Sequence, residues 1–154
     1  MILVSSCLAG IKCRYNGTDS LENTIQQLVN QKKATMVCPE LLGGFSTPRE
    51  PAEIIGGTGI DVLNGTAKVV EKSGKNVTDL YIKGAYQTLK MAKDLNATYI
   101  VLKEASPSCG SQMIYNGNFQ NEKIPGEGVT SALLTNEGFK VISEKELAKL
   151  KLLS

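Results

Sequence analysis

Residues 2–7 read Ile-Leu-Val-Ser-Ser-Cys, and residues 34–38 read Ala-Thr-Met-Val-Cys. Each stretch is a short apolar run that ends at a cysteine, and such runs are typical of buried strands in parallel sheets. Between them, apolar residues recur at helical spacing over residues 21–29, and Asp19 with Glu22 offers a capping box for that helix. Together these elements predict a parallel β-α-β unit with a cysteine at the end of each strand.

The alternation of strands and helices continues through the rest of the chain. The elements predicted further along are a helix at 78–96, a strand at 99–102, a helix at 129–137, a strand at 139–142 and a terminal helix capped by Ser143 and Glu146. The strand at 99–102 again leads into a loop with a cysteine, Ser106-Pro-Ser-Cys109-Gly. The pattern predicts one α/β domain over residues 1–154, with a mostly parallel sheet of about four or five strands flanked by helices.

Residues 39–58 are rich in proline and glycine, but their apolar content favours an ordered loop. The apolar runs at 60–63 and 66–70 are separated by Asn64-Gly65, a dipeptide that suits a type I′ turn, so we predict a small covering β-hairpin there. Gly-Gly-Thr-Gly at 56–59 precedes this expected hairpin rather than a helix, so it does not predict a phosphate-binding loop.

The composition is that of a soluble globular protein, with 154 residues, 42 % hydrophobic and 21 % charged. A formal net charge of +2 gives no basis for a nucleic-acid or membrane-surface interaction. No apolar run approaches the roughly 18 residues of a membrane-spanning helix. Val4-Ser-Ser-Cys7 loosely resembles a lipoprotein cleavage box, but only Met1, Ile2 and Leu3 precede it, so we expect a cytoplasmic protein without a signal peptide.

The chain contains four cysteines and no histidine. In a reducing compartment the cysteines are expected to be thiols or metal ligands rather than disulfides. The absence of histidine excludes Ser-His-Asp and Cys-His catalysis and any His-ligated metal. The chemistry therefore has to use thiol, carboxylate, hydroxyl, Lys, Arg or backbone groups.

Three of the cysteines are expected to converge. Cys7, Cys38 and Cys109 each follow a predicted strand, and ligands of parallel sheets bind where the carboxyl ends of strands meet. Thiolates are soft ligands that suit an iron-sulfur cluster or zinc, and three of them on a [4Fe-4S] cluster would leave one iron open for substrate. The alternative for each is a small buried apolar side chain. For Cys13, in the loop after Cys7, a fourth ligand, a resolving thiol and a packed side chain all remain open.

The only two arginines of the chain, Arg14 and Arg49, lie in the loops that follow Cys7 and Cys38. Because a guanidinium makes planar, bidentate contacts, this placement favours binding of a planar or anionic ligand. The alternative is an ion pair that fixes a loop, such as Arg49 with Glu53.

Further polar side chains are expected in the same pocket. Glu40, two residues after Cys38, is the best candidate for a general base, although it could instead cap backbone N–H groups near Gly43. The hydroxyls of Ser106 and Ser108 could donate to a developing anion, although serine is also an ordinary turn residue.

Several motifs of the chain are shared with a known family. They are Ser5-Ser-Cys-Leu-Ala-Gly, Cys13-Arg-Tyr-Asn-Gly, Cys38-Pro-Glu-Leu-Leu-Gly-Gly, Thr47-Pro-Arg-Glu-Pro-Ala-Glu, Lys103, Ser106-Pro-Ser-Cys-Gly and Ile114-Tyr-Asn-Gly. With these motifs in order over nearly its whole length, the sequence resembles the DUF523 family, which includes the thiouracil desulfidases. The resemblance implies a Rossmann-like fold and a [4Fe-4S] cluster held by Cys7, Cys38 and Cys109, with one open iron. Cys13 falls where the family is expected to vary.

The resemblance also implies a reaction, in which the thiocarbonyl sulfur of a thiolated pyrimidine is replaced by oxygen from water and sulfide is released. It places the catalytic carboxylate at Glu40 and the catalytic serine at Ser106. From their positions in the loops, Arg14 and Arg49 are expected to hold the substrate or the surroundings of the cluster, and Ser108 is expected to contact the substrate. Larger relatives that act on thiolated tRNA carry an added domain, so a small thiolated nucleobase or nucleoside is expected here, and no nucleic acid. Two alternatives remain: a zinc-thiolate hydrolase using the same three cysteines, and a non-enzymatic carrier of sulfur or of an iron-sulfur cluster.

Overall fold

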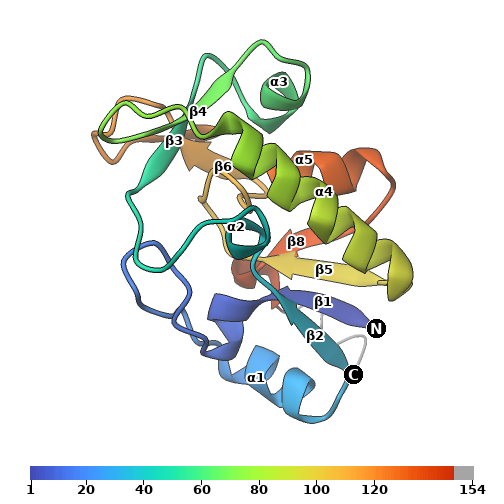
Figure 1. Cartoon of the computed structure of the whole chain (residues 1–154). Helices are drawn as coiled ribbons and strands as arrows, with labels where there is room; N and C mark the ends of the chain where they lie inside the picture. The colour runs from blue at the N-terminus through green and yellow to red at the C-terminus, as the bar shows by residue number, and fades with distance from the viewer. Residues whose placement is uncertain (148–154) are drawn as a thin grey trace.

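The computed structural model describes residues 1–147 as a mixed α/β fold (Figure 1). The elements of its central part are β1 (Ile2–Ser5), the 3-10 helix η1 (Ser6–Ala9), α1 (Asn23–Asn30), β2 (Ala34–Val37), α2 (Pro39–Leu42), α4 (Thr78–Asp94), β5 (Tyr99–Leu102), α5 (Val129–Asn136) and β8 (Val141–Ser143). The peripheral elements are β3 (Ala52–Ile55), α3 (Gly59–Leu63), β4 (Lys68–Glu71), β6 (Met113–Tyr115) and β7 (Lys123–Pro125). No helix of the described part is long and apolar enough to span a membrane.

The central sheet has the strand order β2-β1-β5-β8, and all of its pairs are parallel. Helices cover both faces of this sheet, with α4 and α5 on one side and α1 on the other (Figure 1). Strand β1 shows why: Leu3 packs in the apolar cluster under α4 and α5, whereas Ile2 and Val4 pack in the cluster under α1. Because side chains alternate along a strand, a continuous apolar run supplies both cores. The predicted α/β class with a parallel sheet is confirmed.

The predicted hairpin over residues 60–70 is wrong in its first half. Residues 59–63 form helix α3, and the Thr58 and Asp61 side chains make a reciprocal capping box at its start, with 2.8 Å from the Thr58 N–H to Asp61 Oδ2. The partner of β4 is β3, which lies on the other side of this helix in the chain. The Gly-Gly-Thr-Gly stretch at 56–59 therefore does precede a short helix, contrary to the sequence-based expectation.

Smaller differences occur at other helix and strand ends. The expected capping box at α1 is wrong, because the Asp19 carboxylate accepts the Leu21 N–H (3.0 Å) and Glu22, the N-cap residue, makes no side-chain capping bond. The antiparallel pair of β6 and β7 was not predicted. At the predicted terminal helix, the Ser143 N–H donates to the Glu146 carboxylate at 3.4 Å, and most of that helix falls outside the described residues.

Helix α2 packs against α4 through two glycines. A Cβ at Gly84 would overlap the Pro39 carbonyl oxygen, and a Cβ at Gly43 would overlap the Leu80 carbonyl oxygen. Backbone can therefore approach backbone at this crossing, which sets the place of α2 and of the Glu40 that it carries.

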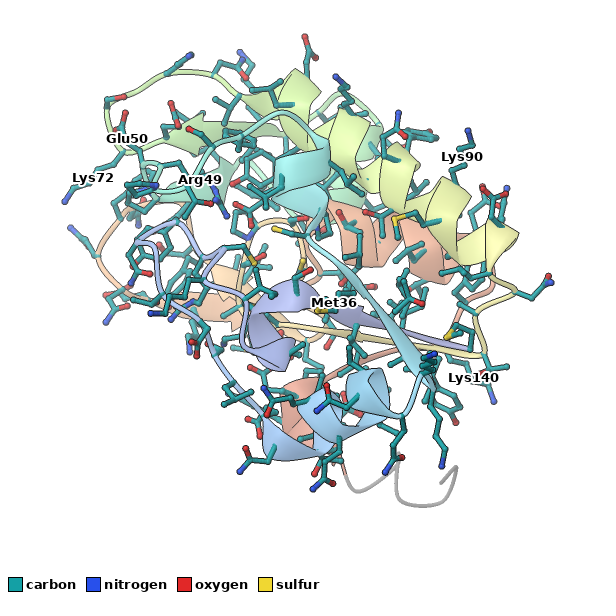
Figure 2. All side chains as sticks on the ribbon, turned by 60° about the horizontal axis from the view of Figure 1, so that its bottom comes forward. Met36, Arg49, Glu50, Lys72, Lys90 and Lys140 are labelled. Atoms are coloured by element: carbon teal, nitrogen blue, oxygen red, sulfur yellow. The ribbon has the colours of Figure 1, made fainter. Side chains whose placement is uncertain are left out.

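We expect Gly84→Ala to lower the free energy of unfolding by about 1–3 kcal/mol, because the new methyl group forces the two helices apart. This loss outweighs the gain of up to about 1 kcal/mol that alanine gives in a helix. Urea unfolding followed by circular dichroism measures the change. Lys90→Ala is the matched control, since Lys90 extends from the solvent side of α4 (Figure 2) and its loss should change stability by less than about 0.5 kcal/mol. Equal stability of Gly84→Ala and the parent would contradict the close approach.

Candidate active site

A cavity of about 460 Å³ opens at the carboxyl edge of the parallel sheet. Its walls come from the loops after β1, β2 and β5, together with residues of the β3–β4 and β6–β7 pairs. All four cysteines of the chain line this cavity, and all four are free thiols. The structure therefore brings together groups that lie more than 100 residues apart in the sequence.

Each of three thiols sits where a strand ends. Cys7 lies in η1 directly after β1, and Gly10, with a φ of +98°, ends that turn in the left-handed region that favours glycine. Cys38 follows β2 in an extended conformation, because it precedes Pro39, which opens α2. Cys109 lies in the loop that follows β5. Since β2, β1 and β5 are neighbours in the sheet, the three loops meet at one edge.

Cys13 also belongs to this group, and it is 4 % exposed. Its thiol lines the same cavity as the thiols of Cys38 and Cys7, and both influence its pKa. The Cys38 thiol lowers the pKa of Cys13, but the Cys7 thiol and burial outweigh it and raise the pKa of Cys13 to about 11. The sequence left the place of Cys13 open, and the structure puts it in the same cavity as the three cysteines selected from the strand ends.

The thiols of Cys38 and Cys109 are also held in their protonated form. The hydrogen bond with Cys13, followed by burial, raises the pKa of Cys38 well above its usual value. Burial, followed by the negative charge of Glu40, raises the pKa of Cys109 to about 12. Since metals bind thiolates, loading this site with a metal centre releases protons.

The Glu40 carboxylate faces the cavity and is held by two donors. Arg49 Nε donates to Glu40 Oε2 at 3.0 Å, and Tyr81 Oη donates to the same oxygen at 3.1 Å. Within residues 1–147 no hydrogen bond is made to Glu40 Oε1, so this oxygen remains able to accept a proton from a ligand in the cavity. Arg49 does not pair with Glu53, whose carboxylate instead accepts backbone N–H groups of the β6–β7 loop.

Arg49 also fastens the loops around the cavity. Its Nη2 donates to the Cys13 carbonyl oxygen at 3.0 Å, and its Nη1 donates to the Ser46 carbonyl oxygen at 3.2 Å. The side chain is only 6 % exposed and lies inside the outline of the molecule, whereas Lys72 extends away from it (Figure 2). Arg49 thus joins the loop after β1 to the loop after β2.

Removal of the Arg49 charge leaves Glu40 without its ion-pair partner in a place that is largely shielded from water. We expect Arg49→Met to lower the free energy of unfolding of the metal-free protein by about 3 kcal/mol. The exposed pair Lys93–Glu137, with an N–O distance of 3.9 Å, provides the matched comparison: Lys93→Met should cost less than about 1 kcal/mol. Chemical denaturation of both variants at neutral pH measures the difference, and similar losses would contradict it.

The two serines of the Cys109 loop have different surroundings. Ser106 lines the cavity, and its Oγ accepts the N–H groups of Ser108 (3.1 Å) and Cys109 (2.7 Å), which leaves its hydroxyl hydrogen free for donation. Ser108 is fully buried, and its hydroxyl bonds Thr130 Oγ1 on α5 at 2.8 Å. Ser108 is not among the residues that line the cavity, so its position gives no support to the predicted substrate contact.

Arg14 lies at the cavity with its guanidinium 5.9 Å from the centre of the Tyr15 ring. Its Nη1 also donates weakly to Thr18 Oγ1, at 3.4 Å. Among the residues that the structure describes, Arg14 makes no ion pair. Its charge therefore remains available to a ligand at the cavity.

Two important residues were missed from the sequence. Tyr81 is 3 % exposed, and burial, followed by the Glu40 charge, raises its pKa. The sequence signal that could have identified Tyr81 is its hydroxyl group on the apolar face of the predicted helix, where Tyr81 stands at helical spacing from Ala85 and Leu89. Glu104 is the second: its Oε1 accepts four backbone N–H groups from the loop that carries Cys109.

The Glu104 carboxylate holds the backbone of this loop in place, because several N–H groups of the loop donate to it. Burial alone would raise the pKa of Glu104, but the backbone donors outweigh it and lower the pKa. One donor is Ala105, whose φ of +72° lies in the left-handed region that a side chain disfavours. The carboxylate therefore stabilises a strained backbone directly before Ser106.

Across residues 1–147, no cluster of three or more Cys, Asp or Glu side chains meets the geometry of a site for one metal ion.

Comparisons with known proteins were made for the whole chain. The model of a family described as 2-thiouracil desulfurase matches residues 2–146. The protein YbbK of Bacillus subtilis (strain 168) is 66 % identical over 147 residues, which are 96 % of this chain and 97 % of YbbK. A solved structure of TudS, a [4Fe-4S]-dependent thiouracil desulfidase, is similar with a TM-score of 0.86 at 40 % identity, and the match covers 99 % of this chain and 95 % of that one.

Proposed function

Because the chain belongs to the 2-thiouracil desulfurase family, we propose that it is a [4Fe-4S]-dependent desulfidase. Its reaction converts the thiocarbonyl of a thiolated pyrimidine and water into the carbonyl and hydrogen sulfide, with no change of oxidation state. The observation that carries this proposal is the meeting of three strand-end thiols and the Glu40 carboxylate at one cavity. The proposed substrate is a free thiolated base or nucleoside.

The donor set of the cavity fits an iron-sulfur cluster. Cys7, Cys38 and Cys109 would hold it, because they come from three neighbouring strand ends and offer only sulfur. When bound, such a cluster with one open iron supplies a soft Lewis acid for the thiocarbonyl sulfur. The free state of all four thiols fits the reducing, cytoplasmic location that we propose for the protein.

The residues of the chain then move the protons. Glu40 Oε1 accepts a proton from the attacking water and returns it to the departing sulfur, while Arg49 and Tyr81 hold the other carboxylate oxygen in place. The hydroxyl of Ser106 donates to the pyrimidine, where negative charge develops during attack. Arg14 at the cavity and Arg49 provide the positive charge that favours an electron-rich ring.

Anaerobic reconstitution with iron and sulfide tests the proposal. We expect about four iron and four sulfide per chain, together with conversion of 4-thiouracil to uracil and release of one sulfide per uracil. The same preparation loaded with zinc should be inactive. Activity in the zinc form would favour a zinc-thiolate hydrolase, and transfer of the cluster to an acceptor protein without turnover would favour a carrier. Failure to bind iron would exclude the proposed chemistry.

A further inference from the structure

Glu53 and Gly117 belong to two of the motifs found in the sequence, but neither takes part in the proposed reaction. Glu53 lies on β3, and Gly117 follows β6, 64 positions later in the chain. Glu53 is 7 % exposed, and its Oε1 accepts the N–H groups of Gly117 (2.9 Å) and Phe119 (3.2 Å). Within residues 1–147 the Glu53 carboxylate makes no ion pair, so these two N–H donors stabilise its buried charge.

The β6–β7 loop also packs closely on β3. Strand β6 lies beside β3 (Figure 1), and a Cβ at Gly117 would lie only 2.7 Å from the Ile54 carbonyl oxygen. The φ of +92° at Gly117 lies in the left-handed region that favours glycine. Together with the bonds to Glu53, this approach of backbone to backbone fixes the loop where it forms one wall of the cavity.

Phe119 stands in this loop in a conformation that its side chain disfavours. Its φ of +55° lies in the left-handed region, which glycine and asparagine tolerate but a bulky residue rarely adopts. Residues in such conformations persist where the surrounding structure holds them, and they are frequent at ligand sites. The bond to Glu53 holds the Phe119 backbone, while the partly buried side chain lines the cavity.

The cavity is lined by four aromatic side chains, which are Tyr15, Tyr81, Tyr115 and Phe119. The three tyrosines already contact another side chain. The ring of Tyr81 lies 5.1 Å from that of Phe45, and a cation lies 5.9 Å from the ring centre of Tyr15 and 5.7 Å from that of Tyr115. In the described part of the chain, Phe119 has no such partner and belongs to neither apolar core cluster. Its ring therefore remains available to a planar ligand.

From these observations we infer that Phe119 is a specificity-determining residue of the site and that Glu53 is its positioning residue. The ring of Phe119 stacks on the pyrimidine ring of the substrate, and the Glu53 carboxylate holds the loop that presents it. Such stacking favours a planar aromatic ring over an acyclic thioamide, which carries the same thiocarbonyl group. The inference rests on the proposed function for its substrate class and adds the contact that selects this class.

Binding of uracil tests the stacking without turnover, because uracil keeps the pyrimidine ring and lacks the sulfur. Isothermal titration calorimetry on the full chain, after anaerobic reconstitution with iron and sulfide, measures the Kd. Phe119→Gly should raise this Kd at least about fivefold, the lower end of the effect of one base stacked on an aromatic side chain. Phe119→Tyr keeps the ring and should bind uracil as the wild type does.

Gln120→Gly is the matched control for the backbone freedom that glycine adds to this loop. Gln120 is the next residue after Phe119, it is exposed, and it is not among the residues that line the cavity. Its variant should therefore leave the Kd for uracil unchanged.

Amide hydrogen exchange tests the role of Glu53 in the full chain without metal or ligand. Glu53→Gln replaces charge-assisted hydrogen bonds by neutral ones, so the N–H groups of Gly117 and Phe119 should exchange at least about fivefold faster in NMR spectra. After reconstitution, the same variant should raise the KM for 4-thiouracil and leave kcat within about twofold, because it weakens binding without changing a reacting group. Glu122→Gln is the matched control, since the Glu122 carboxylate bonds Asn116 on the exposed side of the same loop; it should change neither quantity.

The outcomes separate this inference from the proposed function. A wild-type chain that releases no sulfide from 4-thiouracil would contradict the desulfidase, and uracil binding and amide exchange would still decide the roles of Phe119 and Glu53. Absence of uracil binding by the wild type, equal Kd values for Phe119→Gly and Gln120→Gly, or wild-type exchange rates in Glu53→Gln would overturn the inference. A loss of kcat instead of a higher KM in Glu53→Gln would do so as well.

Discussion

Replacement of Cys7, Cys38 or Cys109 by alanine should each abolish cluster retention. Each variant removes one of three thiols that come from three different strand ends, and the two remaining thiolates are too few to hold the [4Fe-4S] cluster in place. We expect bound iron to fall at least about tenfold below the wild-type value after anaerobic reconstitution and desalting, since loss even of an outer partner of a metal ligand typically costs about 10- to 100-fold in affinity. Iron and sulfide assays, combined with the absorption spectrum of the cluster, measure the loss.

Cys13→Ala is the matched control, since it removes a thiol from the same cavity. We expect this variant to retain most of its cluster and its turnover of 4-thiouracil. Circular dichroism of all four variants without metal shows whether each is folded. If Cys13→Ala loses the cluster while one of the other three variants keeps it, the assignment of ligands is wrong.

The second large effect is expected for Glu40→Gln, which should reduce turnover of 4-thiouracil by about 10²- to 10⁴-fold, the usual contribution of a general acid or base. The amide keeps the size of the side chain and can still accept a hydrogen bond from Tyr81, but it cannot take a proton from water. Cluster content should remain that of the wild type, so the loss should be in kcat. Steady-state kinetics with matched iron content measures it.

Glu137→Gln provides the control for this substitution. Glu137 lies on the surface after α5 in the weak ion pair with Lys93, away from the cavity, so its variant should retain wild-type kcat. A Glu40→Gln protein with full turnover would show that another group moves the proton.

The parallel core of this fold could be predicted because each of its strands carries the signal by itself. The runs before Cys7 and Cys38 and the run at 99–102 are continuous and apolar, as required for strands buried on both faces. Their carboxyl ends share one edge in any parallel sheet, so the meeting of Cys7, Cys38 and Cys109 followed from topology without knowledge of side-chain positions.

The remaining features depend on contacts between distant segments. Residues 60–63 are apolar enough for a strand, but they form a helix because the capping box of Thr58 and Asp61 stabilises a helix start there. The hydrogen bond from Tyr81 to Glu40 joins residues 41 positions apart, and a local sequence pattern does not predict a contact over such a separation. Ser106 and Ser108 share one loop, and only the packing of α5 turns Ser108 toward Thr130.

The pairing of β1 with both β2 and β5 bears on how the protein is made in the cell. Ile2 lies beside Ala34 on one side and beside Tyr99 on the other. A chain emerging from the ribosome thus presents Cys7, Cys13 and Cys38 early, while the wall that carries Cys109 is not yet synthesised. Since long-range strand pairing waits for the later segment, the three cysteines of the proposed cluster site can come together only after residue 109 has left the exit tunnel.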